Sequence, residues 1–216
     1  MKRFGSIGIG ILLLCLAPVV PAFAADKTVA LASLDQHVLP FAKRQAVRAP
    51  IVTETCDCYE IRGASEKDLR DQLQRHGVRI GDGKTYDALT SWDIKWTYDH
   101  DKERSSCTAD NFMVYVDISI RYPEWSRQDA AEPSLETSWN VYLQNLRSHE
   151  QGHRDIAVKK ADELSHAVAA LPPAATCDDL DRSIAVLGRK LMKELNAEQK
   201  AYDTVTGHGA TQGASL

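Results

Sequence analysis

The sequence predicts an α+β fold in which an N-terminal antiparallel sheet with one short helix is followed by a long antiparallel helical hairpin. Two observations predict it. Within residues 28–125, apolar residues recur at every second position, which is the period of strands that bury one face. After Pro133 they recur at intervals of three and four, which is the period of helices that pack along one side. We therefore expect a single domain over residues 25–216, with a mainly β scaffold over residues 25–125.

The first 24 residues have the pattern of a cleavable secretory signal. Lys2 and Arg3 precede an apolar stretch over residues 7–20, and Ala22 and Ala24 supply the small side chains of a cleavage site. We expect cleavage after Ala24, which leaves a mature chain of 192 residues. This chain is expected to be secreted or periplasmic and to lack a membrane anchor.

The mature chain is acidic. Two of the 26 Lys and Arg residues and none of the 30 Asp and Glu residues lie in the leader, which leaves 24 basic against 30 acidic residues. The resulting net charge of −6 argues against a nucleic-acid partner, because phosphates bind basic surfaces.

Four cysteines remain after the leader: Cys56, Cys58, Cys107 and Cys177. An even number of cysteines in an oxidising compartment predicts two disulfides. Because Cys56 and Cys58 would close a very tight ring with each other, we expect both to pair with the other two cysteines. The alternative is a zinc site built on Cys-x-Cys, but the spacing lacks the paired knuckles of such sites.

The first predicted strand and helix lie between residues 51 and 77. β-branched residues are frequent over residues 51–61, and Gly63 interrupts them. Ser65 and the acidic residues after it then begin a short helix, which Gly77 ends.

Two further strands follow this helix. Apolar residues alternate over residues 92–98 and again over residues 114–120, and the polar run between them is expected to form a hairpin connection. Pro123 is expected to end the second strand. The tryptophans of the first strand follow the alternation, so we expect them in the core and not on a sugar-binding platform.

Two long helices are predicted after the sheet. Residues 134–171 contain one glycine and no proline, and their apolar residues and histidines fall at helical spacing. A second helix begins near Cys177, where Asp178 or Asp179 is placed to cap it. The two helices are expected to form an antiparallel hairpin over residues 133–202, followed by a loop and a loosely held tail over residues 203–216.

The first long helix contains the motif His149-Glu150-Gln151-Gly152-His153, which is typical of zinc peptidases. Four residues advance a helix by about 6 Å and leave the two imidazoles about 40° apart around the axis, so both can reach one metal ion. Neutral imidazole nitrogen suits Zn²⁺. Glu150 is one step around the helix from His149, so it can accept a proton from water at the metal without being a ligand.

A catalytic zinc ion needs a third protein ligand and an open position for water. We expect this ligand from the returning helix, because later residues of the first helix lie too far along its axis. With the turn centred near residue 174, the candidates that lie level with the motif or just beyond it are Glu194, Glu198, Tyr202, Asp203 and His208. Glu194 and Glu198 are at least as typical of solvated charges on an amphipathic helix. Tyr202 is placed to donate its hydroxyl to a developing oxyanion.

The two segments together resemble a known family. The motif over residues 149–153, followed about fifty residues later by Tyr202-Asp203-x-x-Thr206-x-His208-Gly209, is similar to the bacterial domain of unknown function 922 family, described as predicted secreted zinc-dependent proteases. The resemblance covers most of the mature chain. It implies a zincin-like peptidase with no established substrate, and it favours His208 over Glu198 as the third ligand.

The sequence thus predicts a zinc-dependent peptidase that acts on a peptide or protein substrate. His149, His153 and His208 are expected to hold Zn²⁺, and Glu150 is expected to be the general base. If the strand before Pro123 lies at a sheet edge, it could align an extended peptide by backbone hydrogen bonds. Two other functions stay open: an exported binding or structural module with a metal closed in by four protein ligands, and an amide hydrolase of cell-wall peptides.

Overall fold

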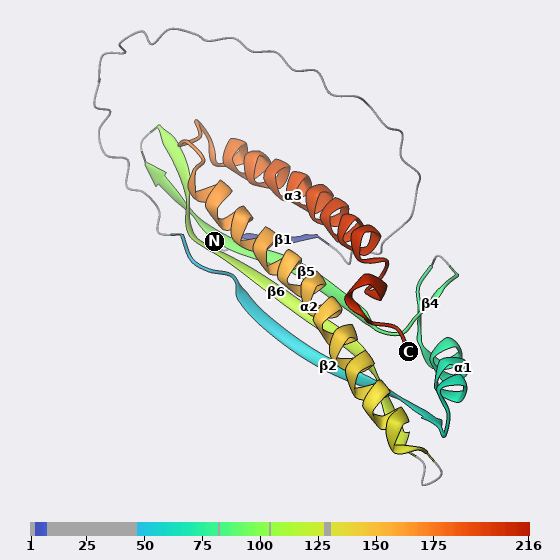
Figure 1. Cartoon of the computed structure of the whole chain (residues 1–216). Coiled ribbons are helices and arrows are strands. Elements are labelled where there is room, and N and C mark those ends of the chain that lie inside the picture. The colour runs from blue at the N-terminus through green and yellow to red at the C-terminus, as the bar shows by residue number, and fades with distance from the viewer. Residues whose placement is uncertain (1–2, 8–46, 82, 104, 128–130) are drawn as a thin grey trace, which may run out of the picture.

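The structure is a computed structural model that describes residues 3–7, 47–81, 83–103, 105–127 and 131–216 of the 216-residue chain. A four-stranded sheet forms one layer, and two long antiparallel helices lie against one of its faces (Figure 1). The predicted α+β class, in which a sheet precedes a helical hairpin, is confirmed.

The elements follow one another in this order along the chain. The first half contains β1 (Arg3–Ile7), β2 (Ile51–Gly63), α1 (Glu66–His76), β3 (Val78–Arg79), β4 (Thr85–Tyr86) and β5 (Leu89–Glu103). The second half contains β6 (Ser106–Arg127), α2 (Pro133–Ala169), α3 (Cys177–Thr206) and the short 3₁₀ helix η1 (Ala210–Gln212). The main sheet has the order β1-β5-β6-β2, and β3 and β4 form a separate two-stranded ribbon.

β6 lies in the interior of the sheet, between β5 and β2. β5 pairs with it antiparallel, as the predicted hairpin requires, but β2 pairs with it in parallel, so the sheet is mixed and not antiparallel. The strand before Pro123 has partner strands on both sides from Tyr115 to Arg121, so the condition under which it could align a peptide is not met there. Alternation within one strand does not reveal its neighbours, and β2 reaches β6 from far away in the sequence, with Ile51 opposite Tyr115.

β6 also continues past Pro123, which was expected to end it, as far as Arg127. Its pairing with β5 stops at the pair of Leu89 and Arg121, so Pro123 has a partner strand only on the side of β2. A strand with one open flank accommodates proline, because the missing N–H there costs no ladder hydrogen bond.

The core lies between the sheet and α2. On β6 the buried side chains at alternating positions include Val114, Val116, Ile118 and Ile120. On β5, Trp92 and Trp96 are each 5% exposed, which confirms them as core residues. The sheet therefore gives α2 a continuous apolar platform, and α2 in turn supports α3.

Hydroxyl side chains cap the starts of α1 and α3. Ser65 begins α1 as expected, and its side chain accepts a hydrogen bond from the backbone N–H of Asp68. For α3 the expected cap was Asp178 or Asp179, but Thr176 is the capping residue and accepts from the N–H of Asp179. The two aspartates lie in the first turn, where negative charge is favourable next to the exposed N–H groups.

The C-terminal segment is more ordered than its composition suggests. α3 continues to Thr206, so Asp203 belongs to the helix and not to a loop. Gly207 ends the helix in the left-handed conformation, with φ of 57°. The tail beyond it was expected to be loosely held, but it packs back onto α2: the Asn145 side chain donates to the carbonyl of Gly213 at 3.1 Å, and Leu216 packs against the core.

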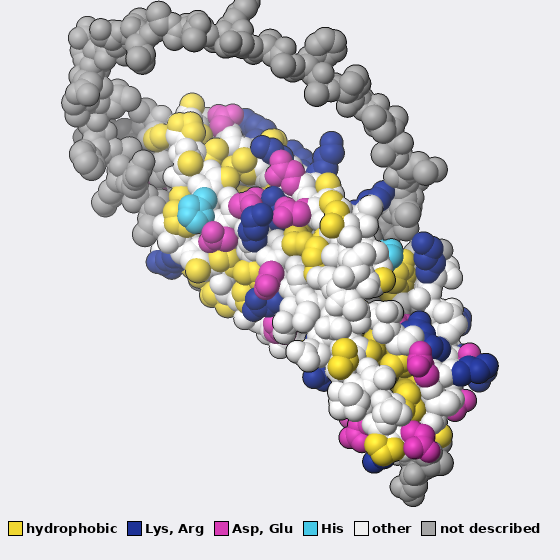
Figure 2. Space-filling view, viewed as in Figure 1, with side chains coloured by type: hydrophobic (Ala, Val, Ile, Leu, Met, Phe, Trp, Pro, Cys, Tyr) yellow, Lys and Arg dark blue, Asp and Glu magenta, His cyan; other side chains and the backbone are white. Residues whose placement is uncertain are grey.

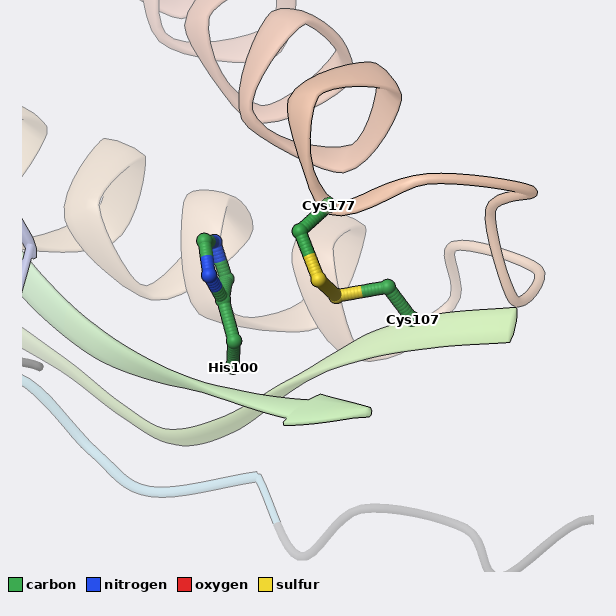
Figure 3. Close-up of side chains that lie close together, drawn as sticks. All are labelled: His100, Cys107 and Cys177. Carbon is green, nitrogen blue, oxygen red and sulfur yellow. A yellow bond between two sulfur atoms is a disulfide. The ribbon is translucent and has the colours of Figure 1, made fainter. Parts of the chain in front are cut away.

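The disulfide pairing differs from the expectation. Cys107 is bonded to Cys177, with the two Cα atoms 5.1 Å apart (Figure 3). Cys56 and Cys58 are free thiols on the surface. The sheet register explains the difference. Cys56 lies opposite Ile120, which is 13 residues along β6 from Cys107. At about 3.3 Å per residue this is about 43 Å, far beyond the reach of a disulfide.

The described residues leave the predicted leader largely untested. Of its 24 positions the structure describes 3–7, which form β1 and pair antiparallel with β5, while the cleavage site lies outside the described residues. Within the described part of the chain, no helix is long and apolar enough to cross a membrane. The disulfide is compatible with an extracellular or periplasmic location.

Candidate metal centre

Three side chains from the helical hairpin converge on one point. His149 and His153 lie one turn apart on α2, and Asp203 faces them from the last turns of α3. The two Nε2 atoms are 3.3 Å apart, and Asp203 Oδ1 lies 3.4 Å from Nε2 of His149 and 3.0 Å from Nε2 of His153. All three are largely buried. The helical hairpin thus brings two imidazoles and a carboxylate together across fifty residues of sequence.

The separations of these atoms match those of ligands around one zinc ion. Zinc is bound by imidazole nitrogen and carboxylate oxygen at about 2.0–2.2 Å with tetrahedral geometry, which places neighbouring ligand atoms about 3.3–3.5 Å apart. The observed values of 3.0, 3.3 and 3.4 Å lie at or close to this edge length. A metal at the centre of this triangle would be in reach of all three atoms without movement of the backbone.

The outer nitrogens of both imidazoles are held by glutamines. Nδ1 of His149 lies 2.9 Å from Oε1 of Gln212, and Nδ1 of His153 lies 2.5 Å from Oε1 of Gln199. Gln199 also donates its amide N–H to the carbonyl oxygen of His153, which fixes the orientation of the amide. With Nδ1–H donated to these carbonyl oxygens, each Nε2 carries its lone pair toward the centre of the cluster. This is the outer-shell arrangement that orients metal-binding histidines.

Tyr202 packs against both imidazoles. Its ring stacks on His149 with centroids 5.1 Å apart and meets His153 edge-on at 5.0 Å. Its hydroxyl accepts a hydrogen bond from Gln212 at 3.1 Å. The ring lies so close to α2 that a Cβ atom at Gly152 would stand 2.1 Å from the hydroxyl oxygen. Gly152 therefore allows the close approach of Tyr202 that holds the two imidazoles in place.

Glu150 lies next to the cluster and is held from the sheet. Its carboxylate accepts a hydrogen bond from the hydroxyl of Thr90 on β5 at 2.7 Å, and its side chain is almost fully buried. Burial raises the pKa of Glu150, against the lowering effect of the Thr90 hydrogen bond and of the two imidazoles. The carboxyl group is thus shifted toward the pKa range of a general base that works near neutral pH.

The charges of the cluster stabilise one another. Burial favours the neutral carboxyl of Asp203, but hydrogen bonds with His149 and His153 outweigh it, so the pKa of Asp203 is lowered. For His153, burial favours the neutral ring, but the hydrogen bond and charge of Asp203 outweigh burial and raise its pKa. The cluster is therefore electronegative enough to hold a cation, either a proton or a metal ion.

The other candidates from α3 lie in different surroundings. Nδ1 of His208 is 3.4 Å from Oδ1 of Asp203, but its side chain is 43% exposed. The ligand atoms that lie within 4.8 Å of one another at this site come from His149, His153 and Asp203, without His208. Glu198 forms ion pairs with Lys159 and Lys160, and Glu194 forms one with Lys190. On the face shown in Figure 2, acidic and basic side chains are interspersed over the helices in the same way. The interpretation of Glu194 and Glu198 as solvated charges is favoured.

A cavity of about 470 Å³ opens onto the cluster. Its walls include His149, Glu150, His153, Asp203 and His208, together with residues of the β3–β4 ribbon and the start of β5. Tyr202 is not among the described residues that line it. Its predicted contact with an oxyanion, like the predicted ligand role of His208, stays a prediction.

Comparison with known protein families gives one match. The family model described as "Bacterial protein of unknown function (DUF922)" matches residues 56–209, which is more than two thirds of the chain. The chain belongs to this family. The DUF922 match contains both histidines, Glu150, Asp203 and His208. Neither the curated proteins nor the solved structures contain a match.

Three residues that support the cluster or Glu150 were missed in the sequence. Gln199 lies four residues before Asp203 on the same helix face, and this spacing was a usable signal once Asp203 was a candidate. Thr90 and Gln212 gave no such signal, because their contacts depend on how β5 and the C-terminal segment pack against α2. Gln212 also lies beyond the matched residues.

Proposed function

We propose that this DUF922 protein is an exported zinc-dependent peptidase of the zincin-like kind, acting outside the cytoplasm after removal of its leader. The observation that carries the proposal is the arrangement of three ligand atoms, 3.0–3.4 Å apart, beside the buried carboxylate of Glu150 in an open cavity. His149, His153 and Asp203 would hold the zinc ion. In such sites zinc supplies polarisation of a carbonyl group and activation of water at neutral pH.

Other residues of the site transfer the proton, orient the imidazoles and contact the metal or the substrate. Glu150 accepts the proton of the attacking water and passes it to the leaving amine, and Thr90 fixes the orientation of its carboxylate. Gln199 and Gln212 keep the imidazoles in the tautomer that presents Nε2. His208 lines the cavity beside Asp203, from which it can contact either the metal or a developing oxyanion.

A structural metal site is the second candidate. His208 lies close to Asp203, where it could supply the fourth protein ligand that a structural zinc site needs. The open cavity beside the cluster favours catalysis instead, because a structural site has no need of solvent access.

Metal analysis of the purified mature protein tests the proposal. We expect one zinc ion per chain, lost in His149→Ala and Asp203→Asn and retained in His208→Ala. Glu198→Gln is the matched control for Asp203→Asn, because it removes a carboxylate from the same helix at a position paired with lysines. If both His149→Ala and Asp203→Asn retained zinc, the proposed metal site would be wrong.

Hydrolysis of a quenched fluorescent peptide mixture separates the two candidates. Glu150→Gln is expected to keep zinc and to lose hydrolysis, because it retains the shape of the side chain but cannot take a proton. If wild-type protein with bound zinc hydrolysed no peptide, or if Glu150→Gln were fully active, the catalytic proposal would be wrong and the structural site would take its place.

A further inference from the structure

The cavity beside the cluster also has apolar walls, which the catalytic proposal does not use. Besides the metal-binding residues, its lining includes Ile80, Ala88, Leu89, Trp92, Leu146 and Ala214. These residues come from the loop after β3, the start of β5, α2 and the C-terminal segment, so four separate parts of the chain supply apolar groups to one space. Apolar surface that faces a cavity is unfavourable in water and is typical of a ligand site.

Apart from the cluster, Glu150 and His208, the charged residues on the cavity walls are Arg70, Lys84 and Asp87. Arg70 forms an ion pair with Asp87 at 2.9 Å, and the same carboxylate oxygen accepts the hydroxyl of Tyr142 at 2.8 Å. The remaining acids on the walls, Glu150 and Asp203, belong to the cluster itself. Lys84 also has a partner within the fold. An acidic ligand group would therefore face two carboxylates, whereas the nearby lysine and arginine side chains already have partners.

We infer that the apolar walls of this cavity receive a bulky uncharged side chain of the substrate, from a residue that flanks the bond to be cleaved. The inference rests on the proposed function and names its substrate class: peptides with leucine-like or aromatic residues next to the scissile bond. One continuous cavity is lined by both Glu150 and the apolar residues, so a side chain next to the bond to be cleaved can reach them. A cavity of about 470 Å³ is within the range of about 300–1,000 Å³ of small-ligand sites, which is room for a large side chain and its peptide group.

The first arm of the test uses wild-type mature protein and a panel of quenched peptides. Each peptide carries Leu, Phe, Gly, Asp or Lys at one of the two positions flanking the scissile bond. At one of these positions we expect kcat/KM for Leu or Phe to exceed that for Asp by about 100-fold or more, since each methylene in an apolar pocket contributes roughly 10–200-fold.

The second arm changes the wall. Ile80→Asp places a carboxylate among the apolar walls, and we expect kcat/KM for the Leu and Phe peptides to fall at least tenfold with zinc content unchanged. Arg79→Gln is the matched control: it lowers the net charge by the same amount at the neighbouring position, whose exposed side chain does not line the cavity. It is expected to behave like wild type.

The third arm measures binding without turnover, by calorimetry of the same peptides on zinc-loaded Glu150→Gln protein. Tighter binding of the Leu and Phe peptides supports the inference even if no peptide is hydrolysed, which would overturn the proposed function alone. Equal binding of apolar and acidic peptides, or Ile80→Asp protein that binds the apolar peptides as wild type does, overturns the inference and leaves the proposed function intact.

Discussion

Gln151 and Gly152 occupy the two middle positions of the histidine motif. Gln151 is exposed, whereas Gly152 lies against the Tyr202 ring, so we expect a larger side chain to be tolerated only at position 151. Replacing Gly152 by alanine puts a Cβ atom 2.1, 2.4 and 2.8 Å from three atoms of the Tyr202 side chain. Ordinary contacts between such atoms are about 3.5–4.0 Å, so the tyrosine ring has to move by more than about 1 Å. The ring stacks on His149 and meets His153 edge-on, so its displacement disturbs the cluster.

Two effects of opposite sign set the size of the change. Alanine is more favourable than glycine in a helix interior by about 1 kcal/mol. Overpacking of a rigid group costs about 1–3 kcal/mol, and an aromatic ring met by a Cβ at 2.1 Å belongs at the upper end. We expect a net loss of about 2 kcal/mol, or a fall in Tm of roughly 4–8 °C for a domain of this size. Zinc affinity should fall as well.

Urea unfolding followed by tryptophan fluorescence measures the change, and a double-mutant cycle identifies its cause. On a Tyr202→Ala background the clash is absent, so Gly152→Ala should become neutral or stabilising by about 1 kcal/mol. Gly81→Ala is the control, because a Cβ atom there meets nothing within 4 Å. Equal destabilisation by Gly152→Ala with and without the tyrosine ring would refute the reasoning.

Three further predictions concern the supports of the site and of the fold. Gln199→Leu removes the partner of His153 Nδ1 and should weaken zinc binding by about 10–100-fold in a chelator competition, whereas unchanged affinity would contradict the outer-shell role. Thr90→Val removes the hydroxyl that orients Glu150 and should lower kcat by about 10–100-fold with zinc content unchanged; full activity would show that the orientation does not matter. Replacing both cysteines of the disulfide by serine should lower the free energy of unfolding by about 2–4 kcal/mol, whereas replacing the two free cysteines should not change it. A thiol titration of the unfolded, unreduced mature protein should find two free thiols, and none would mean that the pairing is different.

The helical hairpin and its motif were predictable because they depend on local spacing. Counting residues on either side of the turn indicated which part of the second helix lies opposite the motif, and Asp203 was among the candidates found there. In the structure Gln199 lies opposite His153, so the hairpin is centred near residue 176 and not near 174. An error of two residues at the turn moves the opposite residue by four, or one helical turn, which is why counting alone could not choose between Glu198 and Asp203.

The sheet was less predictable because its pairings connect distant segments. Alternation identified β5 and β6, but not the parallel addition of β2 that places Pro123 beside one partner strand. The prediction of the disulfide pairing was wrong for the same reason. An even count of cysteines predicts bonds but not positions, and the register of β2 on β6 separates Cys56 from Cys107.

The disulfide fixes the first residue of α3, and Asp203 lies 26 residues further along the same helix. At about 1.5 Å and 100° per residue, Asp203 lies about 39 Å further along the helix axis than Cys177 and about 80° around it. The bridge ties one end of α3 to β6, and the hydrogen bonds of Gln199 tie the other end to α2. Because α3 is anchored to two different elements near its two ends, rotation about its axis is restricted and Asp203 stays turned toward the imidazoles.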